Sequence, residues 1–561
     1  MARFDEQKVD DQLRALHIQE EEQLAQILSK KYNLPYINMD TITVDASAVL
    51  LVPEAAAHDA EITVFQKVGK KIKVAIRNPN SLSAQSILEN LKMQHYEPQV
   101  YMVSRHSLEK AWGRYKEAKK SQPLPKGIVS LEENTIAAQA EIYTINQLRE
   151  HLEPLVASLE ERQTSLTLEV LLKGALTLEA SDIHIEAEEK KTRLRLRLDG
   201  VLHDVLFFSE RVYNLFLSRV KLLSGIKLNI KESAQDGRFT IRTKKEGDIE
   251  VRASTLPGPY GESIVLRILS PKLIALSLEE LGMQKPVLDL MLAELKKPNG
   301  MILTTGPTGA GKTTTLYAFV KHINSPDINI ISIEDPVEYH VEGINQTQVD
   351  ESKGYTFANG LRSIVRQDPD VILVGEIRDL ETAEIAMHAA LTGHLVFSTL
   401  HTNNAPGTIP RLIDLKVQPN IIAPAINVTM AQRLVRLLCL TCRQAHEPTT
   451  EEIQYMEQVF ADLPAPYTKP KKFSEVRMWR APGCIECGGI GYKGRISIFE
   501  VFIINDEIER MILQTPSEVE VRNAAKRQGM LTMQQDGVLK TLAGITTLEE
   551  VMRVTGEKKE Y

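Results

Sequence analysis

Hydrophobic and polar residues follow two different periods along this chain, and the period changes at positions that indicate separate domains. The first 115 or so residues combine helix-like segments such as "EEEQLAQILSKKY" with short strand-like runs such as "KKIKVAI" and "EPQVYMV". Apolar residues at helical spacing predict amphipathic helices, and short apolar runs predict strands. We therefore expect a small α/β domain at the start of the chain.

The pattern then becomes irregular before it returns with a period of two. The stretch "KKSQPLPKGIVSLEENTIAAQ" has two prolines and mixed polarity, which predicts a linker. After about residue 145, a helical segment "LEVLLKGALTL" precedes "TRLRLRLDG", where apolar and charged residues alternate strictly. Such alternation is typical of a half-buried antiparallel strand. With "GRFTIRT", "DIEVRAST" and "ESIVLRIL", it predicts a sheet-based α+β domain that ends near residue 275.

A glycine-rich stretch, "GPTGAGKTTT", lies between an apolar strand, "NGMILTT", and a helical segment, "TTTLYAFVKHI". Its glycines allow backbone N–H groups to turn onto phosphate oxygens, and the helix N-terminus adds its positive end. In this pattern Lys312 reaches the β- and γ-phosphates and the Thr313 hydroxyl binds Mg²⁺. The stretch therefore predicts a nucleotide site. The residues expected to contact the nucleotide are Gly306, Thr308, Gly309, Ala310, Gly311, Lys312, Thr313 and Thr314.

Polar side chains follow or flank the next three apolar strands. "NIISIEDPVEY" carries Glu334 and Asp335 at its strand end, "VILVGEIRD" carries Glu376, and "LTGHLVFSTLHTNNA" places His394 and His401 around a third strand. Acids at the carboxyl ends of parallel strands beside a phosphate loop can hold Mg²⁺ or orient the attacking water. Any one of them alone could instead be a solvated carboxylate that closes a strand.

All four cysteines fall into two Cys-x-x-Cys pairs, Cys439 with Cys442 and Cys484 with Cys487. Four thiolates at this spacing in a reducing compartment predict a tetrahedral, structural zinc site without an open position for substrate. The 41 residues between the pairs exceed the usual ribbon spacing. Two redox pairs, or unrelated buried thiols, are the alternative.

Composition limits the classes of function. A chain of 561 residues should form three or four domains. The net charge of -7 and a pI near 6.1 argue against a general nucleic-acid binder. No run of 18 apolar residues and no apolar signal-peptide core occurs, so we expect a soluble cytoplasmic protein whose membrane association comes through partners.

These motifs together resemble the secretion and type IV pilus ATPases, in the branch that assembles pili. "GPTGAGKTTT" is similar to the phosphate loop of that family, "ISIEDPVEY" to its aspartate-rich box, "RQDPDVILVGEIRDLETAEIA" to its Walker B region and "TGHLVFSTLHTN" to its histidine box. "ASDIHIE", "QDGRF" and "GESIVLRIL" resemble the preceding domain, and the tail "MQQDGVLKTLAGITTLEEVMRVT" resembles the assembly branch. The resemblance covers essentially the whole chain.

The resemblance implies an α/β fold class: a RecA-like P-loop NTPase core preceded by a PAS-like α+β domain. It also implies an N-terminal α/β docking domain, a four-cysteine zinc subdomain and a helical C-terminal tail. The expected boundaries are 1–118 for the docking domain, 119–144 for the linker, 145–275 for the PAS-like domain, 276–430 for the core, 431–495 for the zinc subdomain and 496–561 for the tail.

Roles for individual residues also follow from the resemblance. Glu334 would be the catalytic carboxylate that polarises water, and Glu376 the Walker B acid that supports the metal. His401 would sense the γ-phosphate, with a packed core histidine as the alternative. Candidates for a guanidinium contact with the γ-phosphate, within one subunit or from a neighbour, are Arg238, Arg252 and Arg267. Exposed strand arginines without such a role are the alternative.

The implied function is a hexameric cytoplasmic ATPase, using ATP, Mg²⁺ and Zn²⁺, that works on an inner-membrane platform protein at the cytoplasmic face of the membrane. The resemblance favours type IV pilus assembly, with type II secretion as the alternative. A DNA-uptake or DNA-translocating motor and a ring scaffold without turnover are further alternatives; no specific nucleic acid is expected. Residues 1 to 120 contain no Arg-Leu-Gly string, by which some relatives bind cyclic di-GMP, so we do not expect that ligand.

Overall fold

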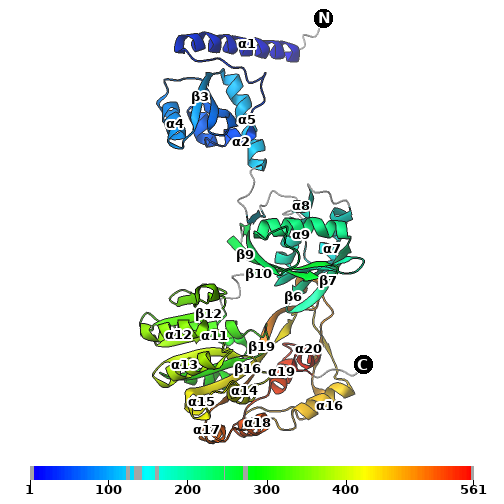
Figure 1. The fold of residues 1–561 in the computed structure, drawn as a ribbon. Helices are drawn as coiled ribbons and strands as arrows, with labels where there is room; N and C mark the ends of the chain where they lie inside the picture. Colours follow the sequence, from blue (N-terminus) through cyan, green and yellow to red (C-terminus); the bar gives the residue numbers. More distant parts are fainter. Residues whose placement is uncertain are drawn as a thin grey trace. The chain divides into compact units, whose positions relative to one another are not determined.

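The computed structural model describes residues 6–121, 127–131, 142–157, 163–244, 247–269 and 276–556. The chain divides into two compact units, Met1–Lys126 and Gly127–Tyr561 (Figure 1). Of the predicted linker, residues 122–126 and 132–141 lie outside the described residues. Within the described part of the chain, no helix combines the length and the apolar character needed to span a bilayer.

The first unit is a three-stranded sheet with helices packed against it, as the sequence predicts. Strands β1 and β2 pair antiparallel, and β2 and β3 pair parallel. Buried Glu22 of α1 accepts hydrogen bonds from Ser104 Oγ (2.5 Å) and Ser107 Oγ (3.0 Å), which attaches α1 to the start of α5. The elements are α1 (Glu6–Tyr32), α2 (Ala46–Val49), α3 (Glu54–Asp59), β1 (Ile62–Val68), β2 (Lys71–Ile76), α4 (Leu82–Met93), β3 (Glu97–Met102) and α5 (Arg105–Ser121).

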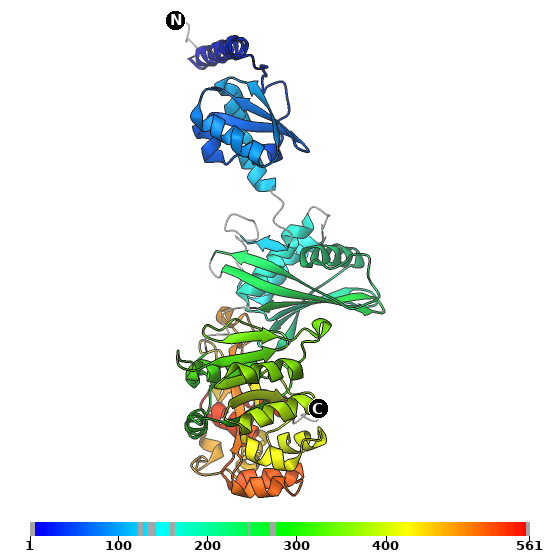
Figure 2. The ribbon, with the colours of Figure 1, turned by 60° about the vertical axis from the view of Figure 1, so that its left-hand side comes forward.

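The second unit begins with a seven-stranded sheet in the order β4-β8-β9-β10-β5-β6-β7. The strands pair antiparallel except β4, which pairs parallel with β8 from within the predicted linker. In β6 every second residue is buried, as the alternating sequence predicts. Figure 2 shows the helices of this part gathered over one face of the sheet. The elements are β4 (Ile128–Ser130), α7 (Ile145–Ala157), α8 (Thr164–Thr177), β5 (Asp182–Ala187), β6 (Thr192–Leu198), β7 (Val201–Phe208), α9 (Glu210–Ser224), β8 (Gln235–Thr243), β9 (Gly247–Gly258) and β10 (Gly261–Leu269).

The core of the second unit is another seven-stranded sheet, in the order β13-β12-β14-β15-β11-β16-β19. All neighbouring strands are parallel except β19, which is antiparallel to β16. The strands are β11 (Gly300–Thr305), β12 (Ile330–Glu334), β13 (Asn345–Gln348), β14 (Val371–Val374), β15 (Leu395–Leu400), β16 (Ile426–Leu438) and β19 (Tyr492–Ile503). The helices are α10 (Lys285–Glu294), α11 (Lys312–Ile323), α12 (Phe357–Ile364), α13 (Leu380–Leu391), α14 (Thr408–Asp414) and α15 (Pro419–Ala425), with short 3-10 turns at Glu279–Leu281, Glu351–Lys353 and Val365–Gln367.

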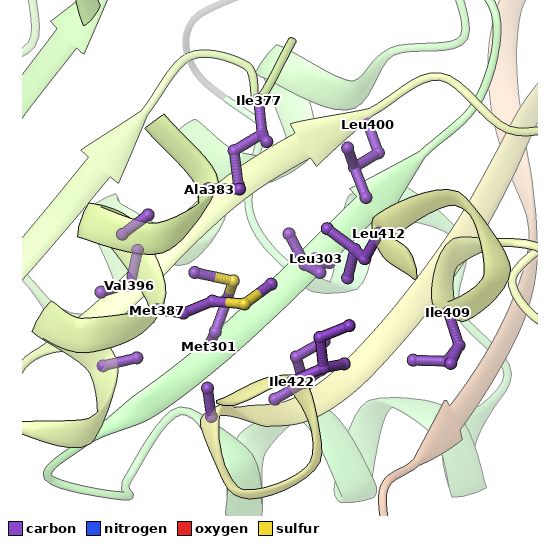
Figure 3. Close-up of a cluster of buried hydrophobic side chains, with 14 of the residues drawn as sticks. Met301, Leu303, Ile377, Ala383, Met387, Val396, Leu400, Ile409, Leu412 and Ile422 are labelled. Atoms are coloured by element: carbon purple, nitrogen blue, oxygen red, sulfur yellow. The ribbon is translucent and has the colours of Figure 1, made fainter. Parts of the chain in front are cut away.

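Apolar side chains cover both faces of this core sheet. On one face, Met301 and Leu303 of β11 pack with Met387 of α13 and Ile422 of α15 (Figure 3). On the other face, α10 and α11 pack over the same strands. Strands buried on both sides are typical of a parallel α/β sheet. The predicted α/β fold class, with a P-loop core, is confirmed.

The cysteine region is an insertion between two strands of the core sheet. Strand β16 leads out to the first cysteine pair and β19 returns from the second, so the expected boundaries at 430/431 and 495/496 each fall inside a strand. The insertion and the tail contain β17 (Gln444–His446), α16 (Thr450–Val459), a 3-10 turn (Phe473–Glu475), β18 (Met478–Arg480), a 3-10 turn (Ile485–Cys487), α17 (Asp506–Ile512), α18 (Glu518–Arg527), α19 (Met533–Leu542) and α20 (Leu548–Thr555).

The C-terminal helices are joined to the core by buried polar contacts. Asp536 of α19 accepts hydrogen bonds from the Phe499 backbone N–H (2.8 Å), from Lys540 Nζ (2.5 Å) and from Gln284 Nε2 (2.9 Å). Both Asp536 and Lys540 are almost fully buried. A buried carboxylate needs such partners, and this one fixes α19 against β19.

Candidate functional site

The phosphate loop joins the carboxyl end of β11 to the start of α11. Gly309 and Gly311 have φ values of +79° and +86°, which side chains other than glycine rarely adopt. A Cβ atom on Gly306 would lie 2.7 Å from the Gln432 carbonyl oxygen, so no larger residue fits there. Gln432 Nε2 on β16 donates a hydrogen bond to the Ala310 carbonyl (2.6 Å) and holds the loop against the sheet.

Lys312 and the threonines stand at the N-terminus of α11. Lys312 Nζ donates to the carbonyls of Gly306 (2.8 Å) and Pro307 (3.3 Å) within its own loop. Burial lowers the pKa of Lys312, and the Glu376 carboxylate opposes that shift. Thr313 is exposed at the helix end, where unpaired backbone N–H groups and the helix dipole favour an anion. The predicted nucleotide-binding residues thus form one continuous cradle.

The register of the core sheet brings the acids and one histidine to the same edge as the loop. β11, β12, β14 and β15 run parallel, so their carboxyl ends lie together. Glu376 pairs with Arg378 and lies 3.4 Å from His401 Nε2. Arg378 also lies 3.7 Å from Asp335. The hydroxyl of Thr313 and the Glu376 carboxylate offer the hard oxygen ligands that Mg²⁺ prefers, so the donor set fits that metal.

His394 lies at the opposite edge of the sheet. Its Nδ1 is 2.8 Å from the Ala389 carbonyl at the end of α13, and its own carbonyl accepts the Gly300 N–H at the start of β11. Because β11 and β15 are parallel, His394 is separated from the phosphate loop by the length of a strand. Of the two histidines around β15, His401 is the one at the nucleotide edge.

Glu334 is held rigidly at the end of β12. The residue is 3% exposed, and its carboxylate accepts hydrogen bonds from Ser332 Oγ (2.6 Å), Gln346 Nε2 (3.2 Å) and the Tyr317 hydroxyl. Burial, together with the hydrogen bond to Glu334, raises the pKa of Tyr317, so this phenol stays a donor.

Glu338, in the same "EDPVEY" stretch, is a candidate that the sequence reasoning missed. Its side chain is 32% exposed, and its Oε2 lies 3.4 Å from Arg252 Nη1 in the preceding sheet. The available signal in the sequence was a second glutamate four residues after Glu334. Arg378 was also missed, although it lies inside the quoted "VGEIRD" stretch, because its ion pairs come from the fold.

The three candidate arginines form a row across neighbouring strands. Arg252 on β9 is directly opposite Arg238 on β8 and Arg267 on β10. Arg252 Nη2 also donates to the Val337 carbonyl (3.3 Å), and Arg267 Nε lies 3.0 Å from Asp182 Oδ1. The row lines a cleft of about 600 Å³ whose other wall includes Pro336 and Gln348. The arginines therefore face the loop that follows β12.

The four cysteines converge into one cluster, with all four Sγ atoms within 4.8 Å of one another. The Cys439–Cys484 and Cys442–Cys487 Sγ distances are 3.8 and 3.9 Å. A Zn–S bond of about 2.3 Å in a tetrahedron requires sulfur atoms roughly 3.8 Å apart. The donor set fits Zn²⁺. The helix α16 and the β17–β18 pair fill the long interval between the two cysteine pairs.

Comparison with known proteins places these features in a family. A model described as "Type II/IV secretion system protein" matches residues 159–553, and a model of the MshEN domain matches residues 32–122. The "Type IV pilus assembly ATPase PilB" of Myxococcus xanthus is 35% identical over 534 residues, covering 95% of this chain and 91% of that protein.

Two further relatives belong to different machines, and their matches cover different shares of the two chains compared. The pilus assembly ATPase PilB of Thermus thermophilus is 37% identical over 541 residues, covering 96% of this chain and 58% of that protein. The "Type II secretion system protein E" of Aeromonas hydrophila is 43% identical over 390 residues, covering 70% of this chain and 75% of that protein.

The cysteine cluster predicts bound metal in the purified chain. We expect about one Zn²⁺ per chain, the content of a single four-thiolate site. Replacing Cys439 or Cys484 with serine should increase proteolysis of the cysteine region while nucleotide binding at the phosphate loop persists, because metal binding contributes folding energy locally. The measurements are elemental analysis and limited proteolysis. Zinc-free protein with four titratable thiols, prepared without chelator, would exclude the zinc site.

Proposed function

We propose that this chain, which belongs to the family of type II/IV secretion system proteins, is the ATP-hydrolysing motor of a type IV pilus assembly machine. The observation that carries this proposal is the extent of similarity to the pilus assembly ATPase of Myxococcus xanthus. That match covers 95% of this chain, whereas the match to the Aeromonas type II secretion protein covers 70%. The type II secretion ATPase remains the second candidate, because its identity over the shared part is higher.

Hydrolysis at this site depends mainly on positioning and charge. Lys312 moves from its loop carbonyls to the β- and γ-phosphates, and the loop N–H groups hold the phosphate oxygens. Mg²⁺ held by Thr313 and Glu376 would neutralise charge that develops on the phosphates. We expect His401, which lies 3.4 Å from Glu376, to respond to the γ-phosphate.

A carboxylate must also orient the attacking water. Glu334 is our first candidate, because its three hydrogen bonds fix the direction of its carboxylate. Glu338 is the second candidate, because it is more exposed and contacts the arginine row. The two glutamates differ in burial and can be distinguished by isosteric substitution.

Closure of the preceding sheet domain would complete the phosphate site. Arg238, Arg252 and Arg267 already face the loop after β12, so a closing movement brings guanidinium groups toward the γ-phosphate within the subunit or from a neighbour. Hydrolysis of ATP would thereby be coupled to movement of the preceding sheet domain. Six copies arranged as a ring would transmit the movement to an inner-membrane platform protein, at the cytoplasmic face of the membrane, with zinc stabilising the cysteine insertion.

Substitutions of the loop lysine and the two glutamates separate binding from turnover. Lys312→Ala should abolish hydrolysis and weaken nucleotide binding, because the ammonium on the phosphates is lost. Glu334→Gln should bind ATP well and hydrolyse it slowly, with Glu338→Gln as its matched comparison. The measurements are phosphate release and titration with a fluorescent nucleotide. Near-normal turnover by Glu334→Gln would remove Glu334 from the catalytic role.

Substitution in the arginine row should reduce ATP turnover without an equal loss of affinity for ATP. Arg252→Ala or Arg238→Ala should reduce the hydrolysis rate by about 10³-fold, the typical size of such guanidinium effects in P-loop enzymes. Arg242→Ala is the control. Arg242 is exposed, lies on β8 as Arg238 does, and forms an ion pair with Asp248 at 2.8 Å. Rates should be measured at concentrations where the oligomer is assembled. Parent-like rates in both test variants would contradict closure as the source of catalysis.

Deletion of the gene in its host tests the proposed machine. Loss of surface pili with normal export of folded proteins is the expected result, restored by the parent gene and not by a Lys312→Ala copy. The measurements are electron microscopy of pili and assay of secreted enzymes. Normal pili together with lost secretion would assign the chain to type II secretion instead.

A further inference from the structure

One end of the first unit carries a concentration of lysines. The turn between β1 and β2 has the sequence "QKVGKKIK", and Lys67, Lys70, Lys71 and Lys73 are named the lysine hairpin here. The register pairs Val68 with Lys71, and Gly69 forms the turn with φ +62°. Lys67, Lys70 and Lys71 are exposed. Within the described residues, none of the four lysines forms an ion pair.

A second loop lies beside the lysine hairpin. The Glu97 N–H donates to the Lys70 carbonyl (2.8 Å), and Lys67 Nζ lies 3.1 Å from the Tyr96 hydroxyl and 4.9 Å from the centre of that ring. The last turn of α4, just before Tyr96, carries another exposed lysine, Lys92. The two loops therefore bring these lysines to the same end of the sheet.

Two apolar side chains are exposed next to these lysines. Val68 at the hairpin turn and Met93 at the end of α4 are each 71% exposed. They contribute little to the core of the first unit, which is built from the buried strands. The acid closest in register is Glu97, opposite Lys71, and it lines a shallow groove of about 460 Å³ with Val68. Five lysines thus outnumber the two nearby exposed acids among the described residues, Glu97 and Glu89 of α4.

We propose that the lysine hairpin, with Lys92 and the Val68 and Met93 side chains, binds the surface of an anionic phospholipid bilayer. Lysine ammonium groups are attracted to lipid phosphates, and their apolar stems allow them to lie at the interface. Small apolar side chains surrounded by lysines can enter the boundary between headgroups and acyl chains. A basic edge that exposes Val68 and Met93 among lysines suits a bilayer better than it suits a protein partner, whose interfaces centre on a packed apolar core.

Co-sedimentation of the full chain with vesicles tests this proposal. Vesicles of phosphatidylcholine with phosphatidylglycerol should bind the chain, and vesicles of phosphatidylcholine alone should bind it weakly. Each lysine at an anionic surface strengthens binding roughly fivefold, so Lys70→Glu combined with Lys71→Glu should weaken binding by at least about tenfold. The control, Lys469→Glu with Lys471→Glu, changes two exposed lysines of the second unit by the same charge and should bind like the parent.

The two exposed apolar side chains provide an independent measurement. Val68→Ser with Met93→Ser should reduce binding even in high salt, where the electrostatic part is screened. Circular dichroism and unchanged nucleotide binding confirm that each variant is folded. Equal binding to both kinds of vesicle, or parent-like binding by the Lys70/Lys71 variant, would overturn the proposal. No vesicle binding by the parent would do the same and would leave an acidic protein as the occupant of this surface.

Discussion

The parallel register of β11, β12, β14 and β15 is the constraint on which the nucleotide site depends. Each strand contributes one polar residue or loop at its carboxyl end, and a one-residue slip would turn the alternating side chains to the other face. The strands are apolar and fully buried, so hydrophobic packing on both faces maintains the register. The chemistry at the edge is thus stabilised by residues that never contact a nucleotide.

Local spacing made the phosphate loop and the cysteine pairs predictable from sequence. The residues of the phosphate loop, and the two cysteines within each pair, lie within a few residues of one another, so each motif can be recognised from a single turn. The order of α and β segments likewise followed from periodicity. The α16 insertion between the cysteine pairs was not predicted, although it explains their long separation.

Contacts between distant segments could not be read from the sequence. Tyr317 of α11 and Gln346 of β13 hold Glu334, but nothing in their own neighbourhoods indicates a carboxylate partner. The alignment of Arg238, Arg252 and Arg267 depends on strand pairing, which single-strand patterns leave open. The sequence does not show where the core ends and the cysteine region begins, because β16 and β19 run from one into the other. These features are set by tertiary packing rather than by local propensity.

Strand β16 serves both candidate sites, and this has a consequence for how such sequences can evolve. Gln432 lies in the middle of β16 and supports the phosphate loop, and Cys439 directly follows the end of the strand. Insertion of a single residue between them, unless a bulge such as the register shift between Arg436 and Leu438 absorbs it, would either direct Gln432 to the wrong face or rotate the first cysteine away from its partners. Length variation should therefore be tolerated more readily inside the long α16 insertion than in the short interval between Gln432 and Cys439.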